Sequence, residues 1–110
     1  MYLHKHDRDE LIGYLADKFP KCFFVDPAQR RPLKHNIIED LEDLKILDRH
    51  RLLQNLDWYE SHFTYRYNIL AGAERIDLDG KKAGTVTVTE QREARAWVEE
   101  RKLEIARRCR

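Results

Sequence analysis

Two aromatic side chains share an otherwise polar face of the longest amphipathic pattern in the sequence. At about 100° per residue, apolar positions from Leu52 to Leu70 form one helical stripe, and a second set lies nearly opposite: Arg51, Gln54, Trp58, Ser61, Tyr65 and Ile69. Flat π faces flanked by arginine and amide donors suit unpaired nucleobases, each stack being worth roughly 1–3 kcal/mol. The pattern also fits a helix packed between two layers, since Trp and Tyr are often partly buried. From the helical pattern alone, packing is the stronger interpretation.

Basic side chains recur in segments that could converge near this face. They are Arg30, Arg31, Lys34, Arg49, Arg51, Arg75, Lys81 and Lys82. Arg49, His50 and Arg51 follow the N-cap candidate Asp48, so they would occupy a first helical turn, where free N–H groups and the helix dipole favour an anion. Together these residues could bind phosphates, although any one of them alone is more simply surface charge.

Sequence patterns typical of enzymes are absent. The chain has no HExxH, GxSxG, Walker or GxGxxG motif. The pairs Asp77/Asp79 and Asp40/Asp43 could be metal-binding carboxylates of a nuclease. However, Asp79 suits the turn before Gly80, and Asp40 and Asp43 lie one helical turn apart on an acidic face. We therefore expect no enzymatic activity, metal or cofactor.

Helices must position most of these residues. A first helix is expected to begin at Asp7, with Glu10 as its capping-box partner, and to stop at Pro20. Residues 22–25 read as a buried extended segment, and residues 37–44 as a short helix. The stripe from residue 49 to 70 predicts one long helix ended by Gly72.

A hairpin and a final helix complete the expected elements. Strands at 75–78 and 83–88 flank the turn formed by Asp79 and Gly80. Thr87 and Glu90 form a capping box that opens the last helix. Because the apolar stripe of that helix is thin, we expect residues 101–110 to be a frayed helical tail.

Composition limits the class of protein. With 110 residues, the chain fits one domain, expected over residues 1–110. Charged residues at 37% and a mean hydropathy of −0.77 exclude a membrane-spanning class. The net charge of +1 does not by itself announce a polyanionic partner. Two distant cysteines and the lack of a signal-length apolar run favour a cytoplasmic protein with reduced thiols.

Three ordered motifs closely resemble the ProQ/FinO domain family of bacterial RNA chaperones. They are residues 19–23 (FPKCF), residues 31–34 (RPLK) followed by Ile37, Asp40 and Leu41, and residues 72–80 (GAERIDLDG) with Gly84. The resemblance covers residues 7–100. It implies an α+β, mostly helical domain of about four to five helices with a small β hairpin. In this family the concave face binds structured RNA, notably terminator hairpins with U-rich single-stranded 3′ tails.

The resemblance also implies roles for individual residues. Lys34 matches a lysine of the concave face, Tyr65 a pocket tyrosine, and Arg75 the arginine that opens a strand, while Arg49 falls at a basic position just inside the long helix. Tyr65 is also one of the two aromatics on the polar face, so the resemblance reverses the preference for packing. The predicted RNA-binding residues are Arg31, Lys34, Arg49, His50, Arg51, Trp58, Tyr65, Arg75 and Lys81.

Four positions depart from the family pattern. Asn36 stands where the family resemblance leads us to expect Gly, Leu53 and Asp57 occupy positions that are basic in a well-known member, and Asp48 replaces a hydroxyl cap. These changes weaken the electrostatic attraction for RNA along the helix. The expected RNA contacts therefore shift toward Arg51, Trp58 and Arg66.

The leading hypothesis is a monomeric RNA chaperone whose partners are small RNAs, mRNA 3′ ends and terminator hairpins, with no membrane partner. The main alternative is a protein-interaction adaptor that has lost most RNA binding, motivated by Leu53, Asp57 and the low net charge. A nuclease using Asp77 and Asp79 and a reader of duplex DNA remain as further alternatives. The salt dependence of binding separates the adaptor from the RNA chaperone, since only phosphate contacts release counterions.

Overall fold

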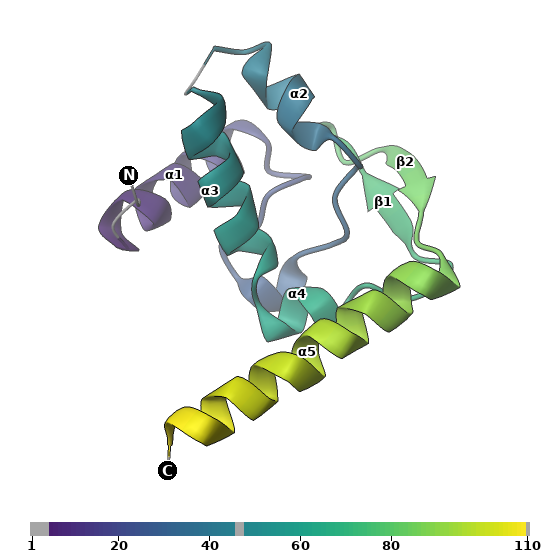
Figure 1. The fold of residues 1–110 in the computed structure, drawn as a ribbon. Coiled ribbons are helices and arrows are strands. Elements are labelled where there is room, and N and C mark those ends of the chain that lie inside the picture. The colour runs from purple at the N-terminus through teal and green to yellow at the C-terminus, as the bar shows by residue number, and fades with distance from the viewer. Residues whose placement is uncertain (1–4, 46–47, 110) are drawn as a thin grey trace.

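The computed structural model describes residues 5–45 and 48–109, with side chains from residue 9 onward in the first helix. Its elements are α1 (Lys5–Lys18), η1 (Pro27–Gln29), α2 (Ile37–Glu42), α3 (Arg49–Glu60), α4 (Phe63–Tyr67), β1 (Glu74–Ile76), β2 (Lys82–Thr85) and α5 (Val88–Arg108). In Figure 1, α3 and the hairpin lie on opposite sides, α2 lies at the top between them, and α5 runs below α4 as a long arm. The mostly helical α+β architecture with a small hairpin is confirmed. Within the described ranges, no helix is long and apolar enough to cross a lipid bilayer.

The first helix starts earlier than expected. Its backbone is already helical at Lys5, two residues before the predicted start at Asp7. The side chain of Asp7, and with it the predicted capping box, lies outside the described side chains. The helix ends at Lys18, ahead of Pro20 as predicted, and buries Ile12 and Leu15.

The segment after α1 is only partly the buried strand-like stretch that the sequence suggests. Cys22 and Phe23 are fully buried, but Val25 is 61% exposed. The pKa of the Cys22 thiol is raised to about 12 by burial, so this cysteine is an inert member of the core.

The predicted long helix is broken. The helix α3 ends at Glu60, His62 is extended (φ −128°, ψ 137°), and α4 begins at Phe63. One extended residue disrupts the helical periodicity, so the core face changes beyond the break. Tyr65 and Ile69 are buried there, whereas Tyr67 and Leu70, which the continuous pattern assigned to the core, are exposed.

The hairpin is confirmed, with shorter strands than predicted. Its strands pair antiparallel with Glu74 opposite Thr85 and Ile76 opposite Lys82. The turn already begins at Asp77, whose carboxylate accepts hydrogen bonds from the backbone N–H groups of Asp79 and Lys81, both at 2.9 Å. Gly80 supplies the positive φ of 76° that this turn needs.

The hairpin also holds the basic connection that precedes α2. The N–H of Lys34 donates to the carbonyl of Ile76 at 2.8 Å, and the N–H of Ile76 donates to the carbonyl of Pro32 at 3.0 Å. This short parallel pairing fixes the backbone of the RPLK segment against β1. This pairing with β1 therefore fixes the position of the backbone from which the side chains after Leu33 extend.

The capping box at the start of α5 is confirmed. Thr87 Oγ1 accepts from the N–H of Glu90, and Glu90 Oε1 accepts from the N–H of Thr87. The helix continues to Arg108, and every residue from 99 to 109 is exposed. Only its first half packs against the rest of the domain, with Ala94 and Val98 buried.

Candidate nucleic-acid interface

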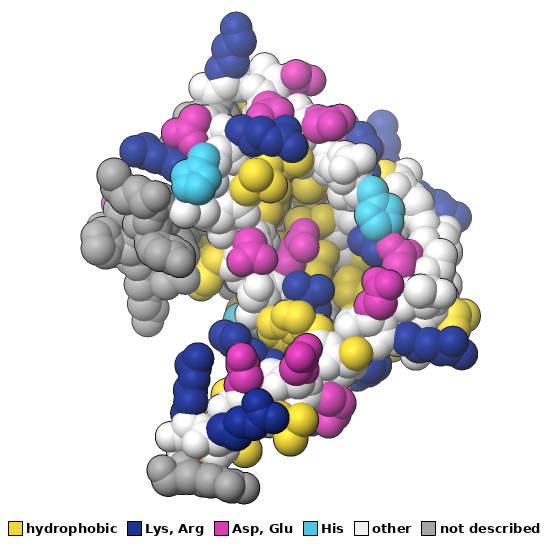
Figure 2. Space-filling model, viewed as in Figure 1, with side chains coloured by type: hydrophobic (Ala, Val, Ile, Leu, Met, Phe, Trp, Pro, Cys, Tyr) yellow, Lys and Arg dark blue, Asp and Glu magenta, His cyan; other side chains and the backbone are white. Residues whose placement is uncertain are grey.

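A hollow of about 520 Å³ opens between α3, the connection before α2 and the arm of α5, and Figure 2 shows acidic, basic and apolar side chains on its walls. We call it the central hollow. Its lining is residues 33–38 of the connection, Leu53, Leu56, Asp57 and Glu60 of α3, Tyr65, Arg66 and Ile69, Arg75 of β1, and Glu90, Glu93, Ala94 and Trp97 of α5. The lining thus comes from five separate segments of the chain, which is why no local pattern reveals it.

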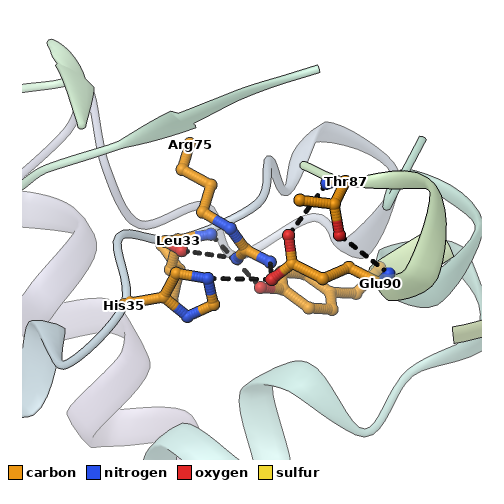
Figure 3. Close-up of polar contacts among 6 residues, drawn as sticks. Leu33, His35, Arg75, Thr87 and Glu90 are labelled. Atoms are coloured by element: carbon orange, nitrogen blue, oxygen red, sulfur yellow. Dashed lines mark hydrogen bonds and ion pairs between the residues drawn. The ribbon is translucent and has the colours of Figure 1, made fainter. Parts of the chain in front are cut away.

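One wall of the central hollow is a polar cluster around Arg75 (Figure 3). Arg75 is only 8% exposed, and its guanidinium donates to the carbonyl of Leu33 at 2.8 Å and to Glu90 Oε2 at 2.7 Å. His35 Nε2 lies 2.8 Å from the same carboxylate oxygen. The backbone N–H of Thr87 and the charge of Arg75 hold the pKa of Glu90 at about 2. The cluster is therefore anchored by a carboxylate that stays ionised at neutral pH.

Tyr65 lines the central hollow from within the core. Its side chain is 3% exposed, its ring meets that of Tyr59 edge-on with centroids 6.1 Å apart, and its hydroxyl accepts from the N–H of Leu33 at 3.2 Å. Burial raises the pKa of this phenol well above its usual value, so it stays neutral. The prediction that Tyr65 lies on a face away from the core is wrong, because the helix break at His62 turns that face inward.

Lys34 lies at the edge of the same hollow. Its Nζ is 2.9 Å from Asp40 Oδ2, and this hydrogen bond raises the pKa of the ammonium group. Two residues on, Asn36 has φ 60° and ψ 27°, in the left-handed region. Glycine adopts that conformation at least cost and asparagine tolerates it. The Gly-to-Asn departure therefore preserves the backbone path from Lys34 into α2.

The central hollow brings together three of the nine predicted site residues: Lys34, Tyr65 and Arg75. Three others occupy the exposed first turn of α3, outside it. Asp48 caps that turn through the N–H of Arg51, as predicted. Arg49 is paired with Glu42 at 2.9 Å, His50 contacts Gln54 at 3.2 Å, and Arg51 lies 3.6 Å from Asp48.

The remaining three predicted residues lie on other surfaces. Arg31 lines a separate small hollow beside Asn68 and Glu74. Lys81 is exposed at the end of the hairpin turn. Trp58 is half-buried, packs against the core and lies under the guanidinium of Arg30 at 5.6 Å.

Arg30, which the sequence also suggested as a phosphate ligand, is a core residue. It is 2% exposed and donates to the carbonyls of Phe24, Tyr59 and Val25 at 3.0, 3.0 and 3.1 Å. Its guanidinium also lies 4.2 Å from the centroid of the Tyr59 ring. These carbonyls, 5 to 29 residues away, engage the guanidinium in hydrogen bonds that hold it within the core, so Arg30 has a structural role.

Sequence reasoning missed the acidic character of the central hollow. Its lining carries three basic side chains, Lys34, Arg66 and Arg75, against four acidic ones: Asp57, Glu60, Glu90 and Glu93. Burial raises the pKa of Glu60, an effect opposed by the charges of Arg66 and Arg75. It also missed Trp97, whose spacing from Ala94 and Val98 reads as an ordinary core position.

The nuclease alternative finds no support in the geometry. The carboxylate of Asp77 is engaged in the hairpin turn by two backbone N–H groups. Among the residues that the structure describes, no three His, Cys, Asp or Glu side chains gather where they could hold a metal ion.

Known proteins share both the sequence pattern and this architecture. The ProQ/FINO family matches residues 6–110. A protein named RNA chaperone ProQ from Aliivibrio salmonicida is 36% identical to this chain over 104 residues, which cover 90% of this chain and 49% of the relative. Another protein of that name, from Idiomarina loihiensis, is 36% identical over 101 residues, which cover 88% of this chain and 48% of the relative. The chain thus spans about half the length of these curated relatives.

Solved structures agree on the fold. The solution structure of a ProQ homolog from Legionella pneumophila superimposes with a TM-score of 0.77 at 26% identity, covering 93% of this chain and 88% of that one. The crystal structure of a FinO-like RNA chaperone from Neisseria meningitidis has a TM-score of 0.63 at 24% identity, covering 83% and 93%. With the family pattern along almost the whole sequence and the same fold in both structures, the chain belongs to the ProQ/FINO family.

Proposed function

We propose that this chain is a single RNA-binding domain that acts as an RNA chaperone, and that its central hollow binds the 3′ end of a terminator-type hairpin with a single-stranded U-rich tail. The observation that carries the proposal is the convergence of Lys34, Tyr65 and Arg75 on one hollow from three separate parts of the chain. The relatives named RNA chaperone ProQ support the part of this proposal that concerns RNA chaperone function.

The groups in the hollow suit an RNA end. Lys34 and Arg75 supply positive charge for phosphates, and the neutral hydroxyl of Tyr65 retains a hydrogen to donate. Arg75 Nε is buried without a hydrogen-bond partner among the described residues, so Arg75 has an unmet donor. Asp40 and Glu90 already pair with Lys34 and Arg75, so an incoming phosphate competes with these carboxylates.

The hairpin stem would contact residues outside the hollow. The first turn of α3 presents Arg49, His50 and Arg51 at the N-terminus of a helix, where the helix dipole favours a phosphate. Arg31, Trp58 and Lys81 lie on other surfaces and would contact only an RNA that reaches beyond the hollow. We propose that the domain works as a monomer in the cytoplasm, on small RNAs and mRNA 3′ ends in post-transcriptional regulation.

The test is binding of the purified chain to a terminator hairpin with a free U-rich tail, beside the same hairpin with a blocked 3′ end, at two salt concentrations. Tight binding that weakens with salt and on blocking is expected. Lys34→Ala should lower affinity and reduce the log–log salt slope by about one. The matched control for Lys34→Ala is Lys18→Ala, which removes a lysine from the exposed side of α1. Asp40→Asn removes the carboxylate that pairs with Lys34 and should tighten RNA binding.

Two results would contradict the proposal. If neither hairpin binds at low salt, the chain is better explained as a protein-interaction adaptor. If duplex DNA of equal length competes as well as the hairpin does, the hollow does not select an RNA end.

A further inference from the structure

Trp97 lies where α4 and α5 meet. It is half-buried on α5 and lines both the central hollow and a second hollow of about 230 Å³ that is bounded by His62, Phe63 and Arg101. Trp58 packs against the main hydrophobic core, whereas Trp97 belongs neither to that core nor to the partly buried side chains packed on it. Its ring is therefore held at a surface between two hollows.

Two residues of α4 hold this ring. The ring of Phe63 meets it edge-on, with centroids 6.0 Å apart and planes at 74°. The guanidinium of Arg66 lies 4.7 Å from the centroid of the Trp97 ring. Arg66 also lines the central hollow, and its Nε is buried with no hydrogen-bond partner in the described part of the chain. The pair thus offers a planar cation and an unmet donor at the wall of the hollow.

The charges of the hollow decide which ligand suits this pair. A cationic ligand is disfavoured at this pair because the Arg66 guanidinium already lies over the Trp97 ring. An anionic ligand is disfavoured by the carboxylates of Glu60, Glu90 and Glu93. A neutral planar group avoids both penalties. Nucleobases stack on tryptophan rings and on arginine planes irrespective of base identity.

We propose that Trp97 and Arg66 form a stacking site for an unpaired nucleobase of the bound RNA, next to the part of the hollow where Lys34, Tyr65 and Arg75 meet. The inference rests on the proposed function and adds a second site to it. Stacking compensates for the acidic side chains of the hollow, because its energy does not require net positive charge.

The first measurement uses the two tryptophans of the chain. In Trp58→Phe, Trp97 is the sole tryptophan, and its fluorescence should be quenched when a hairpin with a U-rich tail is added to saturation. In Trp97→Phe, only Trp58 reports, and the quenching should be much smaller. Saturation is established independently in each case by anisotropy of a dye on the 5′ end of the RNA.

The second measurement compares affinities. Trp97→Leu, which keeps an apolar side chain without the ring, should weaken binding at least about fivefold. Arg66→Lys, which keeps the charge without the plane, should also weaken it. Tyr67→Leu is the matched control, because it removes an aromatic ring stacked by an arginine, Arg95 at 4.6 Å, at the same helix junction but outside both hollows.

A scan of the RNA tail identifies the base involved. Replacing single tail nucleotides by abasic ones should weaken binding of the natural chain at one or two positions, and this penalty should vanish in Trp97→Leu. If the natural chain binds the hairpin tightly, yet Trp97 is not quenched and Trp97→Leu binds as well as Tyr67→Leu, the stacking site is refuted while the proposed function stands. If the natural chain binds no hairpin, the proposed function fails and the stacking site with it.

Discussion

Arg75 and Glu90 form an ion pair of 2.7 Å that ties strand β1 to the first turn of α5. The same carboxylate closes the capping box through the N–H of Thr87 and contacts His35 at 2.8 Å. One side chain thus begins a helix, neutralises a buried guanidinium and shapes a wall of the central hollow. Its ionisation should therefore be visible in the stability of the whole domain.

Glu90→Gln tests this coupling through pH. The pKa of Glu90 is held at about 2 in the folded chain, below the value of about 4.3 expected when unfolded. The ionised carboxylate therefore stabilises the fold above about pH 5, and this stabilisation is lost as the pH falls toward 2. In urea unfolding followed by circular dichroism, natural chain and variant should differ most at pH 6–7 and converge in acid. A constant difference from pH 7 to pH 3 would contradict the assignment.

Glu60→Gln should change the free energy of unfolding at neutral pH in the opposite direction to Glu90→Gln. Burial raises the pKa of Glu60, so the carboxylate that forms at neutral pH is less favourable in the folded chain than in the unfolded one. The variant should have a higher free energy of unfolding at pH 7, and the gain should disappear as the pH falls below the unfolded pKa. Glu93→Gln, an exposed acid of the same hollow, should change little.

Arg30→Lys tests the buried guanidinium. Three backbone carbonyls accept from Arg30, and a lysine ammonium lacks the planar fork that reaches all three. Losing these hydrogen bonds from a buried cation, one of them fully buried, should cost about 3 kcal/mol or more of unfolding free energy. Arg31→Lys, at the exposed neighbouring position, should stay within about 0.5 kcal/mol. Equal effects of the two changes would show that Arg30 is not a structural residue.

Gly80→Ala tests the contact between the hairpin turn and the residues after α1. Gly80 has φ 76°, and an added Cβ would lie 2.6 Å from Lys21 Cβ and 2.9 Å from Lys21 O. Gly72 also has a positive φ, 88°, but an added Cβ there meets nothing within 4 Å. Both alanines carry the backbone strain of about 1 kcal/mol. Gly80→Ala should lower the melting temperature clearly further, and equal shifts would refute the close packing.

The family motifs and the local signals of the sequence predicted much of this protein. The Thr87 and Glu90 capping box, the Asp48 cap and the Asp-Gly hairpin turn depend on residues two to four positions apart, so their spacing alone specifies them. The mostly helical fold and the convergence of Lys34, Tyr65 and Arg75 followed from the resemblance, because no single-helix pattern links those three residues.

Tertiary contacts decided the rest. The buried Tyr65 hydroxyl accepts from the N–H of Leu33, 32 residues away, and the buried Arg30 donates to a carbonyl 29 residues away. The contact of Arg66 with Trp97 joins α4 to α5, two helices that the hairpin separates in the sequence. Helical periodicity assigned faces to one uninterrupted helix, whereas the structure has two, α3 and α4. Local spacing therefore determined where elements start and turn, and only the packed structure determined which side chains face the hollow.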